Sequence, residues 1–186
     1  MQPLSKLFEK IKLIPQVKAA FEEGVVTKVA QNSARTKVRI YVTFKHLLAH
    51  KEVLYLQRQI HKHYFPKKEE VFIVESFDLS TQYTPEILLT EYESSIVEEL
   101  SSCHSPFLGI TFESAEKHFD EDGTLHIKVK GAPIRKEFED ELEEALRVFL
   151  CKRSGFSFDI VFDEPDESEK KSTFQKNKDI EDANRL

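Results

Sequence analysis

The stretch TKVRIYVTF, residues 36–44, decides the fold class of this chain. Its apolar residues Val38, Ile40 and Val42 alternate with others, which is the period of two expected of a strand with one buried face. The outward positions carry Lys, Arg, Tyr and Thr, so that side is expected to meet solvent. We therefore predict a half-buried strand over residues 35–44, which needs a neighbouring strand and a covering helix.

The segments around this strand supply those partners. Their patterns predict a helix over 4–13, a short helical turn ending at Gly24, strands over 25–31 and 35–44, a helix over 51–64 and a strand over 71–77. Pro15 should stop or restart the first helix, and Gly24 should be a left-handed glycine that closes the turn. The first half thus has the order helix, strand, strand, helix, strand.

The same order recurs about 87 residues further along the chain. Leu125, Ile127 and Val129 repeat the alternation of the basic strand. The second half is predicted to contain a helix over 84–100, strands over 109–118 and 124–130, a helix over 133–152 and a strand over 156–162. We therefore predict an α+β fold of two similar αββαβ subdomains, residues 1–80 and 81–164.

Residues 165–186 differ in composition from the rest of the chain. They are mostly Asp, Glu, Lys, Ser and Asn, and such a segment cannot bury enough apolar surface to order itself. We predict a disordered, charged C-terminal tail or linker.

Composition also restricts the setting in which the protein works. No apolar run approaches the roughly 18 residues that a membrane helix needs. The two cysteines are too few for a disulfide framework, and we expect Cys103 and Cys151 to be buried thiols. We therefore expect a cytoplasmic, monomeric protein with no membrane partner.

The charge is divided unevenly between the halves. Residues 1–80 hold 14 Lys and Arg against 8 Asp and Glu, a net of +6, whereas residues 81–186 hold 13 against 25, a net of −12. With Tyr41 interleaved, the basic residues of the first half suit phosphates and stacked bases, or an acidic partner protein. An ordinary solvated surface is the alternative. The candidate contact residues for DNA or a partner are Lys37, Arg39, Lys45, Lys51, Arg58 and Lys62.

Patterns that would indicate catalysis are weak. His61 and His63 are two apart on a predicted helix and do not share a face, so no metal site is expected. The acids of residues 137–144 fit a solvated helix face, and the five glycines form no phosphate loop. We predict no catalytic residue, no metal ligand and no cofactor for this segment. Residues 2–8, QPLSKLF, resemble the short bacterial sliding-clamp-binding peptide, but the helix stripe explains their apolar residues equally well.

Several stretches, taken in order and spacing, resemble the N-terminal region of PolC-type DNA polymerase III, the replicative polymerase of low-GC Gram-positive bacteria. They are LFEKI at 7–11, the strand at 36–44, GF at 155–156 and IVFDE at 160–164. The resemblance implies a first half similar to the polymerase-contacting domain of the clamp-loader tau subunit, and a second half similar to a type II KH fold. It implies a parent DNA-directed DNA polymerase with a 3′–5′ exonuclease, which would use a divalent metal such as magnesium.

We therefore expect a non-catalytic accessory region of a replicative polymerase. It would contact replisome proteins, the clamp loader or other polymerase-associated subunits, and would contact DNA weakly. The alternative is a free-standing KH-like RNA-binding module. The sequence GAPI at 131–134 lacks the second glycine of the Gly-x-x-Gly loop with which KH domains grip nucleic acid. An OB domain encoded directly after Leu186 would favour the polymerase, and a stop codon there the free module.

Overall fold

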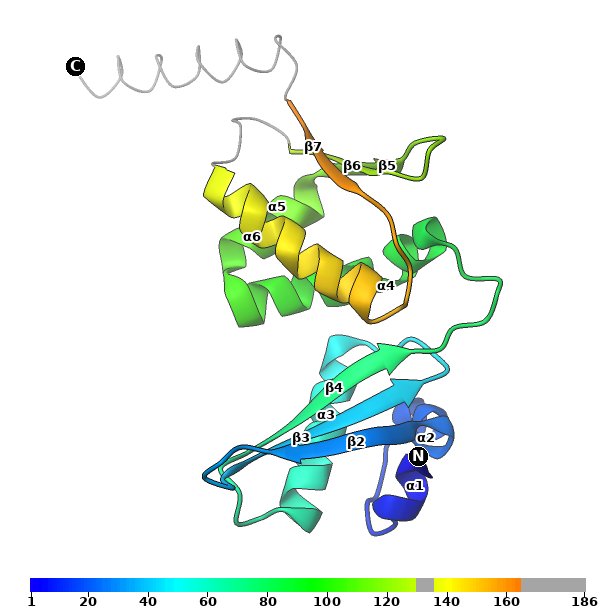
Figure 1. Ribbon diagram of the computed structural model, residues 1–186, viewed down its shortest axis with the longest axis vertical. Helices are drawn as coiled ribbons and strands as arrows, with labels where there is room; N and C mark the ends of the chain where they lie inside the picture. Colours follow the sequence, from blue (N-terminus) through cyan, green and yellow to red (C-terminus); the bar gives the residue numbers. More distant parts are fainter. Residues whose placement is uncertain (130–135, 165–186) are drawn as a thin grey trace, which may run out of the picture. The chain divides into compact units, whose positions relative to one another are not determined.

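The computed structural model describes residues 1–129 and 136–164, which form two compact units with one β-sheet each (Figure 1). The first unit comprises Met1–Ile96 together with Val148–Phe156. The second comprises Val97–Arg147 and the segment that begins at Ser157. The architecture is thus mixed α+β with two small sheets, as the alternating and helical patterns predict.

The first unit holds a four-stranded sheet in the order β1-β2-β3-β4. Its elements are β1 (Gln2–Pro3), α1 (Leu4–Leu7), α2 (Pro15–Glu23), β2 (Val25–Gln31), β3 (Lys37–Phe44), α3 (His50–Tyr64) and β4 (Glu70–Phe77). β2 and β3 are antiparallel, whereas β3 and β4 are parallel and are joined through α3. The expected strand over 25–31 and the expected helix over 51–64 are confirmed to within a residue.

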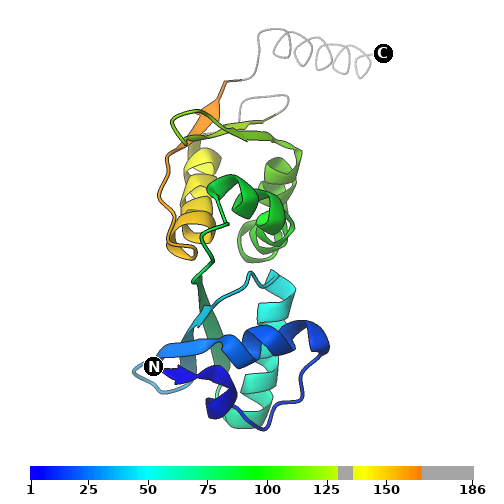
Figure 2. The same cartoon turned by 90° about the vertical axis from the view of Figure 1, so that its right-hand side faces the viewer.

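The core of the first unit lies between this sheet and its helices, which cover one side of it (Figures 1 and 2). Val38 and Ile40 of β3 are fully buried, and so are Leu56 and Ile60 of α3. Burying a side chain of this size contributes about 1.5–3 kcal/mol relative to leaving it exposed. The alternation read from residues 36–44 therefore gives the correct inner face.

The second unit holds a three-stranded sheet in the order β5-β6-β7. The elements of this part of the chain are α4 (Pro85–Glu99), η1 (Leu100–His104), α5 (Pro106–Ser114), β5 (Glu116–Phe119), β6 (Leu125–Lys128), α6 (Lys136–Leu146), η2 (Arg147–Lys152) and β7 (Ile160–Asp163). The boundary between the units falls within α4. β5 and β6 are antiparallel and β6 and β7 parallel, so strand, strand, helix, strand recurs in both sheets.

Helices α2 and α5, which precede the two hairpins, are also alike. Each has proline at its first position, Pro15 and Pro106, where the missing N–H leaves no donor unpaired. Each ends in an extended residue, Gly24 with φ −63° and Ala115 with φ −69°. Gly24 is therefore not the left-handed glycine we predicted. Its lack of a side chain matters because a Cβ would lie 3.1 Å from the ring of Phe44.

The expected helix over residues 4–13 is wrong beyond its first turn. The helix ends at Leu7 because Phe8 leaves the helical conformation, with φ −128° and ψ 48°. The Phe8 ring packs edge-on against Tyr64, with centroids 4.9 Å apart, and is 5 % exposed. A long-range aromatic contact has overridden a local apolar period, and Pro15 then begins α2.

The expected strand over 109–118 is also wrong, because residues 106–114 form α5. Ser105 caps this helix by accepting a hydrogen bond from the Leu108 N–H at 3.3 Å, and Pro106 follows it. The strand β5 then covers only Glu116–Phe119. A cap and an N1 proline therefore decide the local structure against a run of β-branched and aromatic residues.

The cysteines and the last helix differ in part from what the sequence predicts. Cys103 is exposed, so the prediction of a buried thiol is wrong there, and Cys151 is half-buried. The long helix expected over 133–152 is helical from Lys136, and its last turns are wider π-type turns, η2, before Gly155 at φ +79°. The loop at 131–134 and the tail at 165–186 lie outside the described residues.

Candidate functional site

Helices α2 and α3 leave one side of the first sheet uncovered (Figures 1 and 2). Two rows of side chains cross that side. Strand register aligns Ala30 with Arg39 and Phe72, and Lys28 with Tyr41 and Val74. We call these six residues the outer face of the first sheet. Cross-strand neighbours of this kind have Cβ atoms about 5 Å apart, so the six side chains form one continuous patch.

The outer face is hollowed around Arg39. A hollow of ≈ 220 Å³ is lined by Ala30, Gln31, Asn32, Lys37, Arg39, Tyr41 and Phe72. Phe72 is 36 % exposed and Val74 38 %, which is high for apolar side chains in the middle of a strand. Ala30 lies beside Arg39 on the neighbouring strand, and its small side chain leaves room there. The hollow therefore combines two aromatic walls with a guanidinium.

The cations on the outer face and at the edge of its hollow are paired to different degrees. Lys37 Nζ lies 2.5 Å from Glu70 Oε2, and this hydrogen bond raises the pKa of Lys37. Lys28 Nζ lies over the Tyr41 ring, 5.4 Å from its centroid. Among residues 1–129 and 136–164, no carboxylate pairs with Arg39, so its charge is available to a ligand.

A second basic surface lies on α3. Lys51, Tyr55, Arg58 and Lys62 follow one another at the spacing i, i+4, i+7, i+11 and so share one face of the helix. The three cations are exposed, and within the described part of the chain none has an ion-pair partner. We call these four residues the α3 stripe. It lies opposite the buried face of the helix that carries Leu56 and Ile60, so it points away from the sheet.

The six predicted contact residues therefore do not form one surface. Lys37 and Arg39 belong to the uncovered side of the sheet, whereas Lys51, Arg58 and Lys62 belong to the α3 stripe. Lys45 lies in the loop after β3 and is exposed. The sequence did not single out Phe72 and Val74, because both faces of β4 are apolar and only strand pairing shows which one is open.

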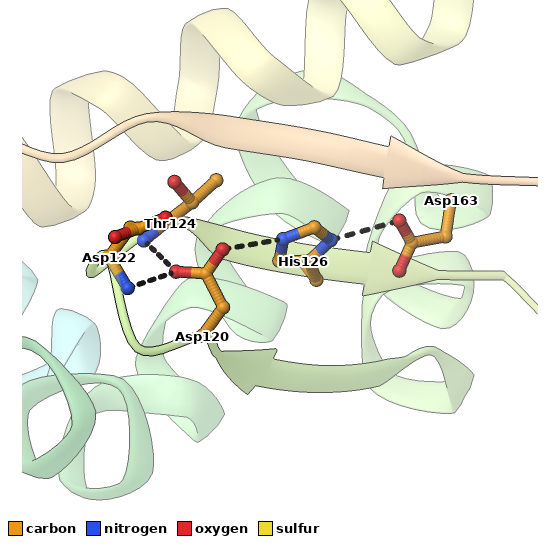
Figure 3. A network of polar contacts seen from close by, with 5 residues as sticks. All are labelled: Asp120, Asp122, Thr124, His126 and Asp163. Carbon is orange, nitrogen blue, oxygen red and sulfur yellow. Dashed lines mark hydrogen bonds and ion pairs between the residues drawn. The ribbon is translucent and has the colours of Figure 1, made fainter.

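The outer side of the second sheet carries a polar network that the sequence did not indicate (Figure 3). His126 Nδ1 lies 2.9 Å from Asp163 Oδ1, and His126 Nε2 lies 3.2 Å from Asp120 Oδ2. Asp120 also accepts the backbone N–H groups of Asp122 and Thr124. Histidine and both acids are therefore held in place by the β5–β6 turn and by β7.

This network shifts the pKa values of its members. Hydrogen bonds to Asp163 and then to Asp120 raise the pKa of His126. The hydrogen bond from the Thr124 N–H is the main cause that lowers the pKa of Asp120. His118 stacks on His126 with ring centroids 5.2 Å apart and an interplanar angle of 16°. The arrangement favours an imidazolium between two carboxylates.

The two histidines near the end of α3 have different surroundings. His61 Nε2 lies 2.8 Å from the Lys68 carbonyl oxygen, and His63 is exposed. Across residues 1–129 and 136–164, no cluster of three His, Cys, Asp or Glu side chains is arranged to hold a metal ion.

The peptide at residues 2–8 is built into the fold. Leu4 is fully buried and Phe8 is 5 % exposed, and the Leu4 N–H donates to the Gly24 carbonyl at 2.8 Å. Leu4 and Phe8, two of the side chains that would enter a clamp pocket, are therefore core residues, and Leu7 is half-buried. This agrees with the helix-stripe interpretation of Leu4 and Phe8, although the helix itself ends at Leu7.

Comparison with known families finds a match within the first unit. Residues 4–74 match the family of the DNA polymerase III polC-type N-terminus I. The resemblance stated from the sequence is confirmed over these residues, which contain β2, β3, α3 and most of β4. No curated protein matches the chain. Among the described helices, none is both long and apolar enough to cross a bilayer.

Proposed function

We propose that this chain is a non-catalytic accessory region of a PolC-type replicative DNA polymerase that contacts proteins of the replisome. The observation that carries the proposal is the family match over residues 4–74, because it falls on the unit with the exposed α3 stripe. We place the protein contact on that stripe. Its three cations, which have no ion-pair partner within residues 1–129 and 136–164, lie around one tyrosine and suit an acidic surface, such as one on the clamp loader or another polymerase-associated subunit.

The rest of the proposal follows from this role. The protein would be cytoplasmic and monomeric outside the polymerase, and the segment would need no cofactor, while magnesium or another divalent metal would serve the parent polymerase. The second unit would act as a type II KH-like scaffold. Its three strands and flanking helices support that comparison, and the lack of a second glycine at 131–134 favours a KH-like unit that does not grip nucleic acid.

Partner binding tests the proposal directly. Purified chain is titrated against the purified clamp-loader tau subunit, sliding clamp and polymerase core, each immobilised in turn. We expect K51E/R58E/K62E to weaken the interaction by about tenfold or more, because charge complementarity is lost. The control K6E/K18E/K67E changes the charge equally at exposed lysines outside the stripe and should retain binding. Equal losses in both variants, or no binding to any of these proteins, would contradict the proposal.

The non-catalytic role has a separate test. The purified chain should neither extend a primed template nor degrade single-stranded DNA with magnesium or manganese. Metal-dependent turnover that co-purifies with the chain and is lost when one of its own acids is replaced would show that the segment is catalytic.

A further inference from the structure

We infer that the outer face of the first sheet binds single-stranded DNA, stacking bases on Tyr41 and Phe72 while Arg39 and Lys28 reach phosphates. This goes beyond the proposed protein contact, which uses the α3 stripe, and the two can fail independently. The inference starts from the uncovered side of the sheet, where aromatic and basic side chains alternate across three strands.

Geometry favours a stack of two bases. Tyr41 lies one strand over and two residues along from Phe72, since Arg39 pairs with Phe72 and Tyr41 with Val74. Diagonal neighbours of this kind are about 7–8 Å apart, and both rings line the same hollow. Aromatic side chains on an open sheet stack bases in other single-strand readers. The two rings therefore suit successive nucleotides.

Charge selects a polyanion. Arg39 lies beside Phe72 in the strand register and two residues from Tyr41 on β3, and no carboxylate among residues 1–129 and 136–164 pairs with it. Lys28 adds a second cation at the Tyr41 row, and Lys37 a third that is shared with Glu70. Exposed rings beside cations are the combination with which single-strand readers stack bases and track the backbone phosphates. The match to a DNA polymerase segment favours DNA.

The outer face also sets the number of phosphates in contact. Lys28 and Arg39 of the outer face, together with Lys37 beside it, are three cations, and three phosphate contacts give a log–log dependence of affinity on salt with a slope of about −2 for a single strand. If all the basic residues of the first unit took part, about five contacts would raise the slope to about −4. The slope therefore distinguishes the sheet face from a diffuse basic surface.

The experiment is a salt titration by fluorescence anisotropy with a labelled oligothymidylate and, in parallel, the matching oligouridylate. We expect the wild type to bind the DNA with a slope of about −2, and Y41L/F72L to weaken binding by about tenfold or more. Leucine keeps these strand positions apolar, and far-ultraviolet circular dichroism checks the fold. Arg39→Gln should lower the slope by about one unit. Quenching of tyrosine fluorescence by DNA should shrink in Tyr41→Leu.

Two matched controls make the result specific. Phe107→Leu removes a ring that is 52 % exposed on α5 and should leave affinity unchanged. K51Q/R58Q/K62Q removes the α3 stripe and should cost no more than about threefold, since charges more than about 10 Å away are screened. The proposal is overturned if Phe107→Leu weakens binding as much as Y41L/F72L, if the stripe carries the affinity, if RNA binds more tightly than DNA, or if DNA does not bind at low salt.

Discussion

The two sheets place different chemistry at matching positions. Arg39 in β3 and His126 in β6 each point outward and each pair in register with the parallel strand, with Phe72 and Val161 respectively. Arg39 carries a permanent charge beside an open hollow. His126 carries a conditional charge, and its ring nitrogens are already engaged by two carboxylates. The same strand arrangement thus gives one outer surface whose arginine is available to a ligand, and another whose histidine is already hydrogen-bonded within the unit.

The inner sides differ as well. β4 is longer than β7, its counterpart in the second sheet. The extra part of β4 carries Glu75, whose side chain is buried at 5 % exposure. Arg153 of the same unit lies 2.9 Å from that carboxylate and is 13 % exposed. The ion pair in the second unit between Arg147 and Glu143 is far more exposed, at 41 % and 31 %. Buried and exposed pairs should therefore respond very differently to the loss of one partner.

The largest effect is expected from Arg153→Ala. Removing the arginine leaves the Glu75 carboxylate buried without its guanidinium, which costs about 3–5 kcal/mol of unfolding free energy. Arg147→Ala, which breaks the exposed pair, should cost only about 0.2–1 kcal/mol. All five tyrosines lie within Met1–Ile96, so urea unfolding followed by tyrosine fluorescence reports the first unit.

An apolar replacement of both partners sharpens this prediction. E75L/R153M should recover most of the stability lost in Arg153→Ala, because well-packed apolar side chains can replace a buried ion pair at little cost. Similar losses for Arg153→Ala and Arg147→Ala would mean that burial does not govern the two pairs.

A smaller effect is expected at Gly109, which matches Lys18 when α5 and α2 are aligned on their first prolines. A Cβ on Gly109 would lie 3.0 Å from the Val97 carbonyl oxygen and would collide with Ser101 Oγ. Gly109→Ala should therefore destabilise the second unit by about 1–3 kcal/mol although alanine favours helices. Lys18→Ala should stay within about 0.5 kcal/mol of wild type, since Lys18 is exposed.

Hydrogen exchange of peptides from β5 and β6 measures the effect of Gly109→Ala, because the second unit contains no tyrosine in its described part. Adding Ser101→Ala should restore part of the lost protection by removing the hydroxyl that the new methyl meets. If Gly109→Ala is neutral or the double substitution gives no recovery, close packing between α5 and η1 is not what selects glycine.

How well the sequence predicted each helix or strand depends on whether the interactions that determine it lie within one continuous segment. The period of two in residues 36–44 and the helix over 51–64 were correct, because each pattern extends over several turns or pleats. The start of α5 was missed although its signals, Ser105 and Pro106, are local, since they were outweighed by the aromatic and β-branched residues that follow. The end of α1 was missed because its cause is the contact of Phe8 with Tyr64, which lies far along the chain.

The candidate site was predicted less well than the fold. Lys37 and Arg39 were placed on an open strand face by alternation alone. Arg58 and Lys62 were grouped with them because the net charge of a segment does not show on which surface of the fold each basic residue lies. The role of His126 could not be anticipated, since Asp163 reaches it only through the parallel pairing of β6 and β7.

The smallest effect, and the one that separates the two sheets most directly, is the pH dependence of the second unit. Because Asp163 and Asp120 raise the pKa of His126 in the folded chain, the protonated imidazole stabilises the unit. That contribution is complete below the ordinary histidine pKa of 6.5 and is lost as pH rises through the raised value. The lowered pKa of Asp120 contributes fully at every pH above its ordinary 3.8 and is lost only as pH falls below that value, so it does not change between pH 6 and pH 8.5. Hydrogen exchange of β5 and β6, corrected for intrinsic rates, should show weaker protection at pH 8.5 than at pH 6.

His126→Gln should remove most of this difference, whereas Arg39→Gln, at the matching position of the first sheet, should leave it unchanged. Protection that stays constant with pH in the wild type, or that strengthens at pH 8.5, would mean that the imidazolium does not hold the hairpin to β7.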